Sequence, residues 1–133
     1  MNAFNNLVFV YGTLKRGFHN NHHFSKLESR FVGEATTLHP YSMFNTKYNF
    51  PALLRGGYSH IIQGELYECS DKQMAKLDKL EGVPDLFVRK EILVECKSQG
   101  FKVWCYFLNT KGTNNLEILD GQISSPTRQL SYN

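Results

Sequence analysis

The sequence predicts an α+β fold, in which a compact, mostly antiparallel and barrel-like β-sheet is accompanied by flanking helices. Most apolar segments are short and rich in β-branched or aromatic residues, as strands are. One segment alone, at about 71–81, has both the spacing and the end signals of a helix. Because strands and helices do not alternate along the chain, a doubly wound parallel sheet is not expected.

Length and composition define the class of protein. The 133 residues show no shift in composition, so we expect one domain over residues 1–133. The net charge of +3 comes from scattered residues, which argues against a nucleic-acid partner. The three cysteines form no CxxC pair and the N-terminus resembles no secretory signal, which indicates a reduced, cytoplasmic protein. No apolar run approaches the roughly 20 residues that span a bilayer, so no membrane partner is expected.

The first predicted strand ends in a turn that could bind an anion. The apolar run Leu7–Tyr11 stops at Gly12, and a strand that ends at a glycine turn leaves consecutive backbone N–H groups without ladder partners. The nest would be built from Tyr11, Gly12, Thr13 and Leu14. Lys15 and Arg16 continue this loop.

The chain between the first strand and the helix is expected to be irregular and then β-rich. Residues 18–30 predict one or two helical turns, and residues 31–48 predict two strands or one bent strand. Pro51 and the pair Gly56-Gly57 predict a loop. Residues 60–69 predict a strand in which Gly64 marks a bulge or a close approach of backbone.

After the helix the sequence predicts a hairpin and a tail. Residues 88–96 and 101–108 are β-rich and are joined by a short polar segment that suits a hairpin turn. After Asn109 the chain is polar, and it could form a strap over the sheet or be partly loose.

The segment at 71–81 is the clearest helix. Ser70 with Gln73 three residues later forms a capping-box pattern at its start, and Gly82 followed by Pro84 supplies a stop. The three lysines at 72, 76 and 79 share one face, which is expected to be solvated. The opposite third of the circumference carries Gln73, Met74, Leu77, Leu80 and Glu81.

Glu81 is therefore the candidate catalytic residue. A carboxylate directed inward with an apolar stripe has a raised pKa, because desolvation disfavours its charged form. Such a group can exchange protons near neutral pH. The alternative is that Glu81, as the last residue before Gly82, frays outward or pairs with Arg89 or Lys90. Combined with the anion nest, a proton-transfer group makes a minimal active site for a zwitterionic substrate.

Three other patterns could carry chemistry. His19, His22 and His23 could suggest a metal site, but no acidic or cysteine ligand is nearby in sequence, and we expect none. The cysteines at 69, 96 and 105 all fall in apolar β-rich segments, where buried and inert thiols are usual. Trp104 and Tyr106 share a strand face that could imitate a base-stacking surface, although barrel core or pocket lining is the more common role.

The motifs together resemble the gamma-glutamylcyclotransferase-like (AIG2-like) family, and most closely its gamma-glutamylamine cyclotransferase branch. The resemblance rests on the run Val8–Gly17 with Asn21-His22 following, and on Leu77-Asp78-Lys79-Leu80-Glu81-Gly82. Shorter matches occur in the same order at 39–41, 50–54, 64–67 and 87–89. The family's usual tyrosine is replaced by Phe87, so any hydrogen bond of that hydroxyl would be absent or replaced.

The resemblance implies a fold and a reaction. The fold would be a compact antiparallel barrel with helices beside it. The reaction would convert gamma-glutamylamines, such as gamma-glutamyl-epsilon-lysine, or gamma-glutamyl amino acids to 5-oxoproline and the free amine, without metal or organic cofactor. It further implies that Glu81 is the general acid/base and that Tyr11, Gly12, Thr13 and Leu14 bind the glutamyl portion. Lys15 and Arg16 would lie on the rim of the site.

A non-catalytic binding or interaction module of the same fold is the alternative, since fold alone does not establish function. A binding module has no need to sustain a buried acid, so an inward-facing Glu81 favours the enzyme. The sequence specifies neither the leaving amine nor the oligomeric state.

Overall fold

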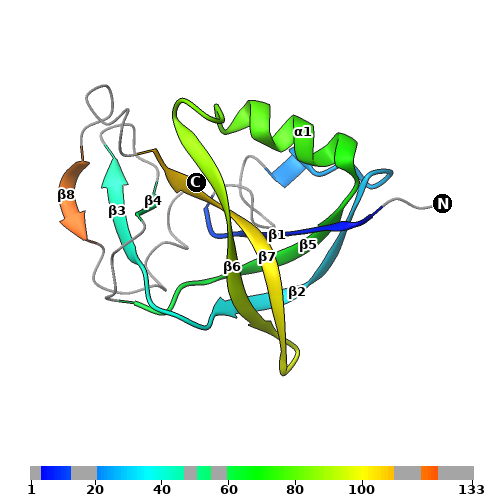
Figure 1. Ribbon diagram of the computed structural model, residues 1–133, viewed down its shortest axis with the longest axis horizontal. Coiled ribbons are helices and arrows are strands. Elements are labelled where there is room, and N and C mark those ends of the chain that lie inside the picture. Colours follow the sequence, from blue (N-terminus) through cyan, green and yellow to red (C-terminus); the bar gives the residue numbers. More distant parts are fainter. Residues whose placement is uncertain (1–3, 13–20, 47–50, 55–59, 110–117, 123–133) are drawn as a thin grey trace.

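The computed structural model describes residues 4–12, 21–46, 51–54, 60–109 and 118–122, and for residues 44–46, 51, 54 and 118–122 only the backbone is considered. Five strands close a barrel in the order β1-β5-β2-β6-β7. The helix α1 lies across this barrel, and a three-stranded sheet of order β4-β3-β8 stands beside one end (Figure 1). The elements are β1 (Asn6–Val10), a 3-10 turn (Asn21–His23), β2 (Ser29–Thr37), β3 (Ser42–Thr46), β4 (Pro51–Leu54), β5 (Gln63–Cys69), α1 (Asp71–Leu80), β6 (Phe87–Cys96), β7 (Gln99–Leu108) and β8 (Ile118–Gln122).

The barrel is antiparallel except at its seam. β1 pairs antiparallel with β5, but it pairs parallel with β7, where Val8 lies opposite Trp104 and Phe9 opposite Cys105. The predicted α+β class with a mostly antiparallel barrel is confirmed. In the described part of the chain the flanking helices amount to one α-helix and one 3-10 turn.

The longest hairpin follows the predicted pattern. β6 and β7 pair along ten residues each, and the two-residue turn between them is Lys97-Ser98. Both residues have positive φ angles, 53° and 67°, as a type I′ turn requires to match the twist of the flanking strands. The hairpin prediction is therefore confirmed.

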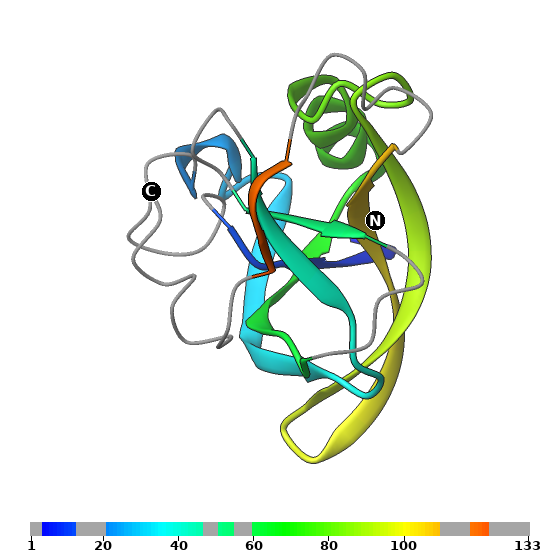
Figure 2. The same ribbon diagram turned by 90° about the vertical axis from the view of Figure 1, so that its left-hand side faces the viewer.

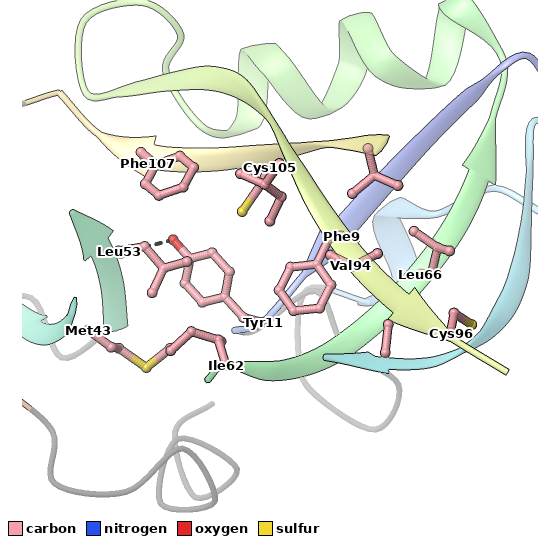
Figure 3. Packing of buried hydrophobic residues seen from close by; sticks show 13 residues of the cluster. Phe9, Tyr11, Met43, Leu53, Ile62, Leu66, Val94, Cys96, Cys105 and Phe107 are labelled. Atoms are coloured by element: carbon pink, nitrogen blue, oxygen red, sulfur yellow. Dashed lines mark hydrogen bonds between the residues drawn. The ribbon is translucent and has the colours of Figure 1, made fainter. Parts of the chain in front are cut away.

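Alternation along β1 separates two apolar cores. Phe9 and Tyr11 point into the barrel, where they join residues such as Leu53, Ile62 and Phe107 (Figure 3). Val8 and Val10 point outward into a second cluster, which α1 covers with Met74 and Leu77. The helix is thus held by the outer face of β1, β5 and β7, above the barrel in both ribbon views (Figures 1 and 2).

Gly64 marks a close approach of backbone, as its place in the sequence predicts. A Cβ atom at this position would clash with the backbone oxygen of Val10 and would lie 2.7 Å from Cζ of Phe9. Only glycine lets β5 approach β1 so closely at this point. The bulge lies instead in the neighbouring strand β2, between Phe31 and Gly33.

The start of α1 departs from a complete capping box. The Ser70 hydroxyl accepts the N–H of Gln73 at 3.0 Å, as predicted. The side-chain amide of Gln73 does not bond back to Ser70, because it is buried between α1 and the segment around residues 23–25. There its Oε1 accepts the N–H of Ser25 at 3.0 Å, and its Nε2 donates to the carbonyl of His23 at 2.8 Å. One buried side chain therefore ties α1 to the segment after the 3-10 turn.

The region for which two strands or one bent strand were predicted contains two separate strands, β2 and β3, in its described part. Two other local expectations are corrected. Pro51 opens the strand β4 and does not lie in a loop, which is possible because proline is tolerated at the first position of a strand. Leu80 is 38% exposed and lies outside the buried stripe of α1, whose buried residues are Gln73, Met74 and Leu77.

Candidate functional site

The direction of α1 brings its last turn to the end of β1. At its start, Asn6 Nδ2 at the beginning of β1 donates to Asp71 Oδ1 at 2.8 Å. Near its end, Asp78 accepts from the hydroxyl of Tyr106, which lies two residues beyond the β7 partner of Val8. The helix therefore runs in the same direction as β1, and Figure 1 shows both ending on the side of β3 and β4. Glu81 follows Asp78 by three residues, about 4.5 Å along the axis.

The end of α1 is built as a Schellman motif. Glu81 is the C-cap residue and donates its N–H to the carbonyl of Leu77 at 2.9 Å. Gly82 has a φ of +69° and donates to Lys79, while Val83 donates to Asp78 at 2.9 Å. These bonds fix the backbone of Glu81. The predicted helix, 71–81, thus has Asp71–Leu80 as its helical residues and Glu81 as its cap.

Glu81 has the electrostatic property that its position predicts. Glu81 is half-buried, and desolvation of its side chain raises the pKa of the carboxyl to about 7. Arg89, which could have formed an ion pair with Glu81, pairs with Asp78 instead. Its Nε lies 2.9 Å from Asp78 Oδ1, and its Nη2 donates to Asp78 Oδ2 at 3.0 Å. Lys90 is exposed. Outward fraying is also disfavoured, because the hydrogen bonds of the Schellman motif hold the backbone of Glu81 in place.

Tyr11 marks the other half of the site, at the end of β1. Its ring is buried in the barrel, and its hydroxyl accepts the N–H of Leu53 at 3.2 Å (Figure 3) and donates to the carbonyl of Tyr106 at 3.0 Å. Burial is the main cause that raises the pKa of Tyr11 well above its usual value, with smaller electrostatic contributions from Cys105 and Glu81. The carboxyl of Glu81 therefore lies within electrostatic range of this hydroxyl.

The remaining members of the predicted anion nest are only partly described. Gly12 follows Tyr11 directly beyond the end of β1 and is half-buried. Thr13 and Leu14 lie outside the described residues, as do Lys15 and Arg16. The role of the Tyr11–Leu14 segment in binding therefore stays a prediction.

A polar cluster next to Glu81 was not predicted from the sequence. Asp78 accepts from the Tyr106 hydroxyl at 2.7 Å and forms an ion pair with Arg89, whose guanidinium lies 4.4 Å from the centre of the Trp104 ring. A signal was present, because Asp78 and Glu81 are three residues apart and so lie on adjacent parts of the same helix face. Trp104 and Tyr106 are thus packed under α1 and do not form an exposed stacking surface.

The other candidate groups are placed as follows. His22 and His23 belong to the 3-10 turn, with ring centres 4.1 Å apart, while His19 lies outside the described residues. In the described ranges, no three of the His, Cys, Asp and Glu side chains gather as a metal site would require. Cys69, Cys96 and Cys105 are buried, as predicted, and form no disulfide among the described residues, and burial raises the pKa of Cys69 to about 12. A thiol of this kind is a poor nucleophile at neutral pH.

No helix in the described part of the chain is long and apolar enough to cross a bilayer. The one α-helix there, α1, has ten residues.

The arrangement brings a proton-transfer group to the open end of a β-strand. A carboxyl with a pKa of about 7 is populated in both forms at neutral pH, so it can accept a proton in one step and return it in the next. The segment that is predicted to bind an anion follows directly at the end of β1, beginning with Tyr11 and Gly12. This combination suits acid/base chemistry on a small polar molecule.

Comparisons with known proteins agree with the motifs. The family described as "Gamma-glutamyl cyclotransferase, AIG2-like" matches residues 8–124. A Drosophila melanogaster protein with the provisional name gamma-glutamylcyclotransferase is 41% identical over 130 residues, which cover 91% of this chain and 82% of that protein. The gamma-glutamylaminecyclotransferase of Bos taurus is 32% identical over 135 residues, covering 95% and 80% of the two chains. The crystal structure of an AIG2-like protein from Mus musculus is 26% identical and superposes with a TM-score of 0.73 over 79% of this chain and 78% of that one.

Proposed function

Because the chain belongs to the AIG2-like gamma-glutamyl cyclotransferase family, we propose that it converts a gamma-glutamyl compound to 5-oxoproline and the free amine, with Glu81 as the general acid/base. The observation that carries this proposal is the carboxyl of Glu81, whose pKa burial raises to about 7 and which caps α1 on the side of the barrel where β1 ends. A cyclisation of this kind needs a group that moves protons near neutral pH.

The substrate supplies its own nucleophile. Its alpha-amine can close a five-membered ring on the gamma-carbonyl carbon, so the two reacting groups are already close together. The unprotonated carboxylate of Glu81 accepts a proton from the alpha-ammonium, and the amine nitrogen then forms a bond to the gamma-carbon. The bond from that carbon to the leaving nitrogen breaks as Glu81 returns the proton to this nitrogen. The ring nitrogen then loses its remaining extra proton, which the released amine takes up to leave as an ammonium ion, so protons balance and the carboxylate of Glu81 is regenerated.

The end of β1 would bind the charged part of the substrate. The backbone N–H groups of Gly12, Thr13 and Leu14, in the segment that begins at Tyr11, would hold either the alpha-carboxylate or the oxyanion that develops on the gamma-carbonyl. Both are negatively charged oxygens, and preorganised backbone donors stabilise either one. The proposed mechanism uses no metal and no organic cofactor.

We propose gamma-glutamylamines as the substrate class. This rests on the similarity to the bovine protein named gamma-glutamylaminecyclotransferase, which extends over most of both chains, and on the human protein of the same name, 34% identical over 67% of this chain. Gamma-glutamyl-epsilon-lysine is the representative compound. Gamma-glutamyl amino acids share the glutamyl end and differ only in the leaving amine, so they are the main alternative.

The direct test is a panel of substrates with 5-oxoproline as the common product. The panel contains gamma-glutamyl-epsilon-lysine, two gamma-glutamyl amino acids and a simple gamma-glutamylamine, at equal concentrations. We expect the protein to form 5-oxoproline from each compound that is a substrate, and we expect the highest kcat/KM for the gamma-glutamylamines. Higher kcat/KM for the amino acids would change the substrate class, and no product from any compound would favour a non-catalytic binding module.

A further inference from the structure

We propose that Asp78 and Tyr106 are positioning residues that hold Glu81 in place against the end of β1. This inference rests on the proposed function, because it concerns the group that would carry protons in that reaction. Neither residue needs to contact the substrate, since both act on Glu81 through the last turn of α1.

The first contact attaches the last turn of α1 to the barrel through the side chain of Asp78. The Asp78 carboxylate accepts from the Tyr106 hydroxyl at 2.7 Å and from Arg89 Nη2 at 3.0 Å. Tyr106 and Arg89 are directly opposite each other in the β6–β7 hairpin. A single carboxylate therefore binds both strands of the hairpin, and charge-assisted hydrogen bonds of this type are the stronger ones.

The second contact connects Asp78 to the backbone of Glu81. The Asp78 carbonyl accepts the N–H of Val83 at 2.9 Å, which closes the Schellman motif around Glu81. The side chain of Asp78 thus anchors the turn to the barrel, while its main chain anchors the residues that follow Glu81. A substitution of Asp78 is therefore expected to displace the turn that carries Glu81 more than the rest of α1.

The third contact extends the chain of bonds to the opposite half of the site. The carbonyl of Tyr106 accepts the hydroxyl proton of Tyr11 at 3.0 Å. Tyr106 consequently holds the end of β1 with its main chain and the last turn of α1 with its side chain. The separation between Glu81 and the Tyr11–Gly12 segment is therefore set largely by Tyr106 and Asp78.

Such a separation matters because proton transfer and ring closure depend on distance. A displacement of about 1 Å at a reacting group can cost on the order of 100-fold in rate. Loss of positioning lowers kcat and leaves KM nearly unchanged, because the binding groups at the end of β1 stay in place.

The test compares Tyr106→Phe and Asp78→Asn with the wild type, using full-length protein and gamma-glutamyl-epsilon-lysine. Tyr106→Phe removes only the hydroxyl that reaches Asp78 and retains the carbonyl that binds Tyr11. Asp78→Asn retains an oxygen that can accept from Tyr106 but loses the charge that pairs with Arg89. We expect kcat to fall roughly 10-fold or more in each variant with KM within about twofold. The double variant should lose little more than the worse single variant, because both changes weaken the same anchor, which is the attachment of the Asp78 side chain to the β6–β7 hairpin.

A matched control is the ion pair between Arg30 and Glu68, which joins β2 and β5 near the start of α1 and not at its last turn. Glu68→Gln removes one ion pair, as Asp78→Asn does, and is expected to keep kcat within about twofold. Thermal unfolding of every variant shows whether it is folded at the assay temperature. The inference is overturned if kcat stays within twofold in both site variants, if KM alone changes, or if the Glu68→Gln control loses as much activity.

The two proposals fail in different ways. If the wild type forms no 5-oxoproline from any compound in the panel, the proposed function fails. If the wild type is active and Tyr106→Phe and Asp78→Asn are as active as it is, only the positioning role fails. If Asp78→Asn is unfolded, Tyr106→Phe decides the outcome alone, because it removes a single oxygen and leaves the aromatic ring in the apolar cluster under α1.

Discussion

The hydroxyl of Tyr11 donates to the backbone carbonyl of Tyr106 at 3.0 Å, inside the barrel, and joins the end of β1 to β7. The same hydroxyl accepts the N–H of Leu53 from β4, so three strands meet at one oxygen atom. In this way the barrel and the additional sheet are fixed relative to one another at the end of β1.

The first prediction concerns this oxygen atom. Tyr11→Phe leaves the N–H of Leu53 and one acceptor position of the Tyr106 carbonyl without their partner in a buried environment. We expect the free energy of unfolding to fall by about 1–3 kcal/mol. Urea denaturation followed by the fluorescence of Trp104, the single tryptophan, would show a lower midpoint with an unchanged slope. An unchanged midpoint would mean that the hydroxyl does not tie the strands together.

The second prediction concerns the close approach of β5 to β1. Gly64→Ala places a methyl group against the Val10 oxygen and the Phe9 ring, neither of which can move without disturbing the barrel. We expect a loss of stability of about 3 kcal/mol or more, or failure to fold. Gly100→Ala is the matched control, because its methyl group would lie 3.9 Å from Leu38 in ordinary contact. Circular dichroism during heating would separate the two, and equal melting temperatures would contradict the prediction.

Part of this architecture could be predicted from the sequence because the signals are local. Ser70 and Gly82 mark both ends of α1 by their capping chemistry, and the hairpin is marked by two β-rich segments around a short polar turn. The placement of Glu81 beside buried positions followed from helical periodicity alone. Pro51 was misjudged because proline both breaks strands and tolerates their first position.

The Asp78, Arg89 and Tyr106 cluster could not be predicted, because it joins residues from three elements that approach one another only in the folded barrel. Sequence periodicity shows which face of α1 carries Asp78 but not which strand lies under it. Leu80, the last residue of α1, is 38% exposed, and the spacing of apolar residues along the helix does not show this either.

The third prediction concerns stability and pH. The pKa of Glu81 is about 7 in the folded protein and about 4.5 without burial, so between these values the unfolded chain ionises while the folded protein keeps its proton. The contribution of this carboxyl to stability is present below pH 4.5 and is lost as the pH rises through 7. Relative to Glu81→Gln, the wild type should therefore lose on the order of 1–2 kcal/mol over this range, after a reduction for partial exposure. Urea denaturation of both proteins at pH 4.5 and pH 8 would measure it, and a difference independent of pH would contradict it.

The fourth prediction concerns the rate. The proposed base is the ionised form of Glu81, so kcat/KM should fall about tenfold per pH unit below its pKa of about 7 and level off above it. The measurement is initial 5-oxoproline formation between pH 5 and pH 8 at low substrate concentration. A rate that stays constant down to pH 5 would show that no group with this pKa accepts the proton.

The central claim is that Glu81 carries the proton, and the most direct measurement is 5-oxoproline formation from gamma-glutamyl-epsilon-lysine by Glu81→Gln. Glutamine has nearly the same shape and cannot exchange a proton, so it isolates this function. A fall in kcat of roughly 100-fold or more is expected, together with an unchanged fold by circular dichroism and retained binding of 5-oxoproline by calorimetry. Turnover close to that of the wild type in this folded variant would contradict the account.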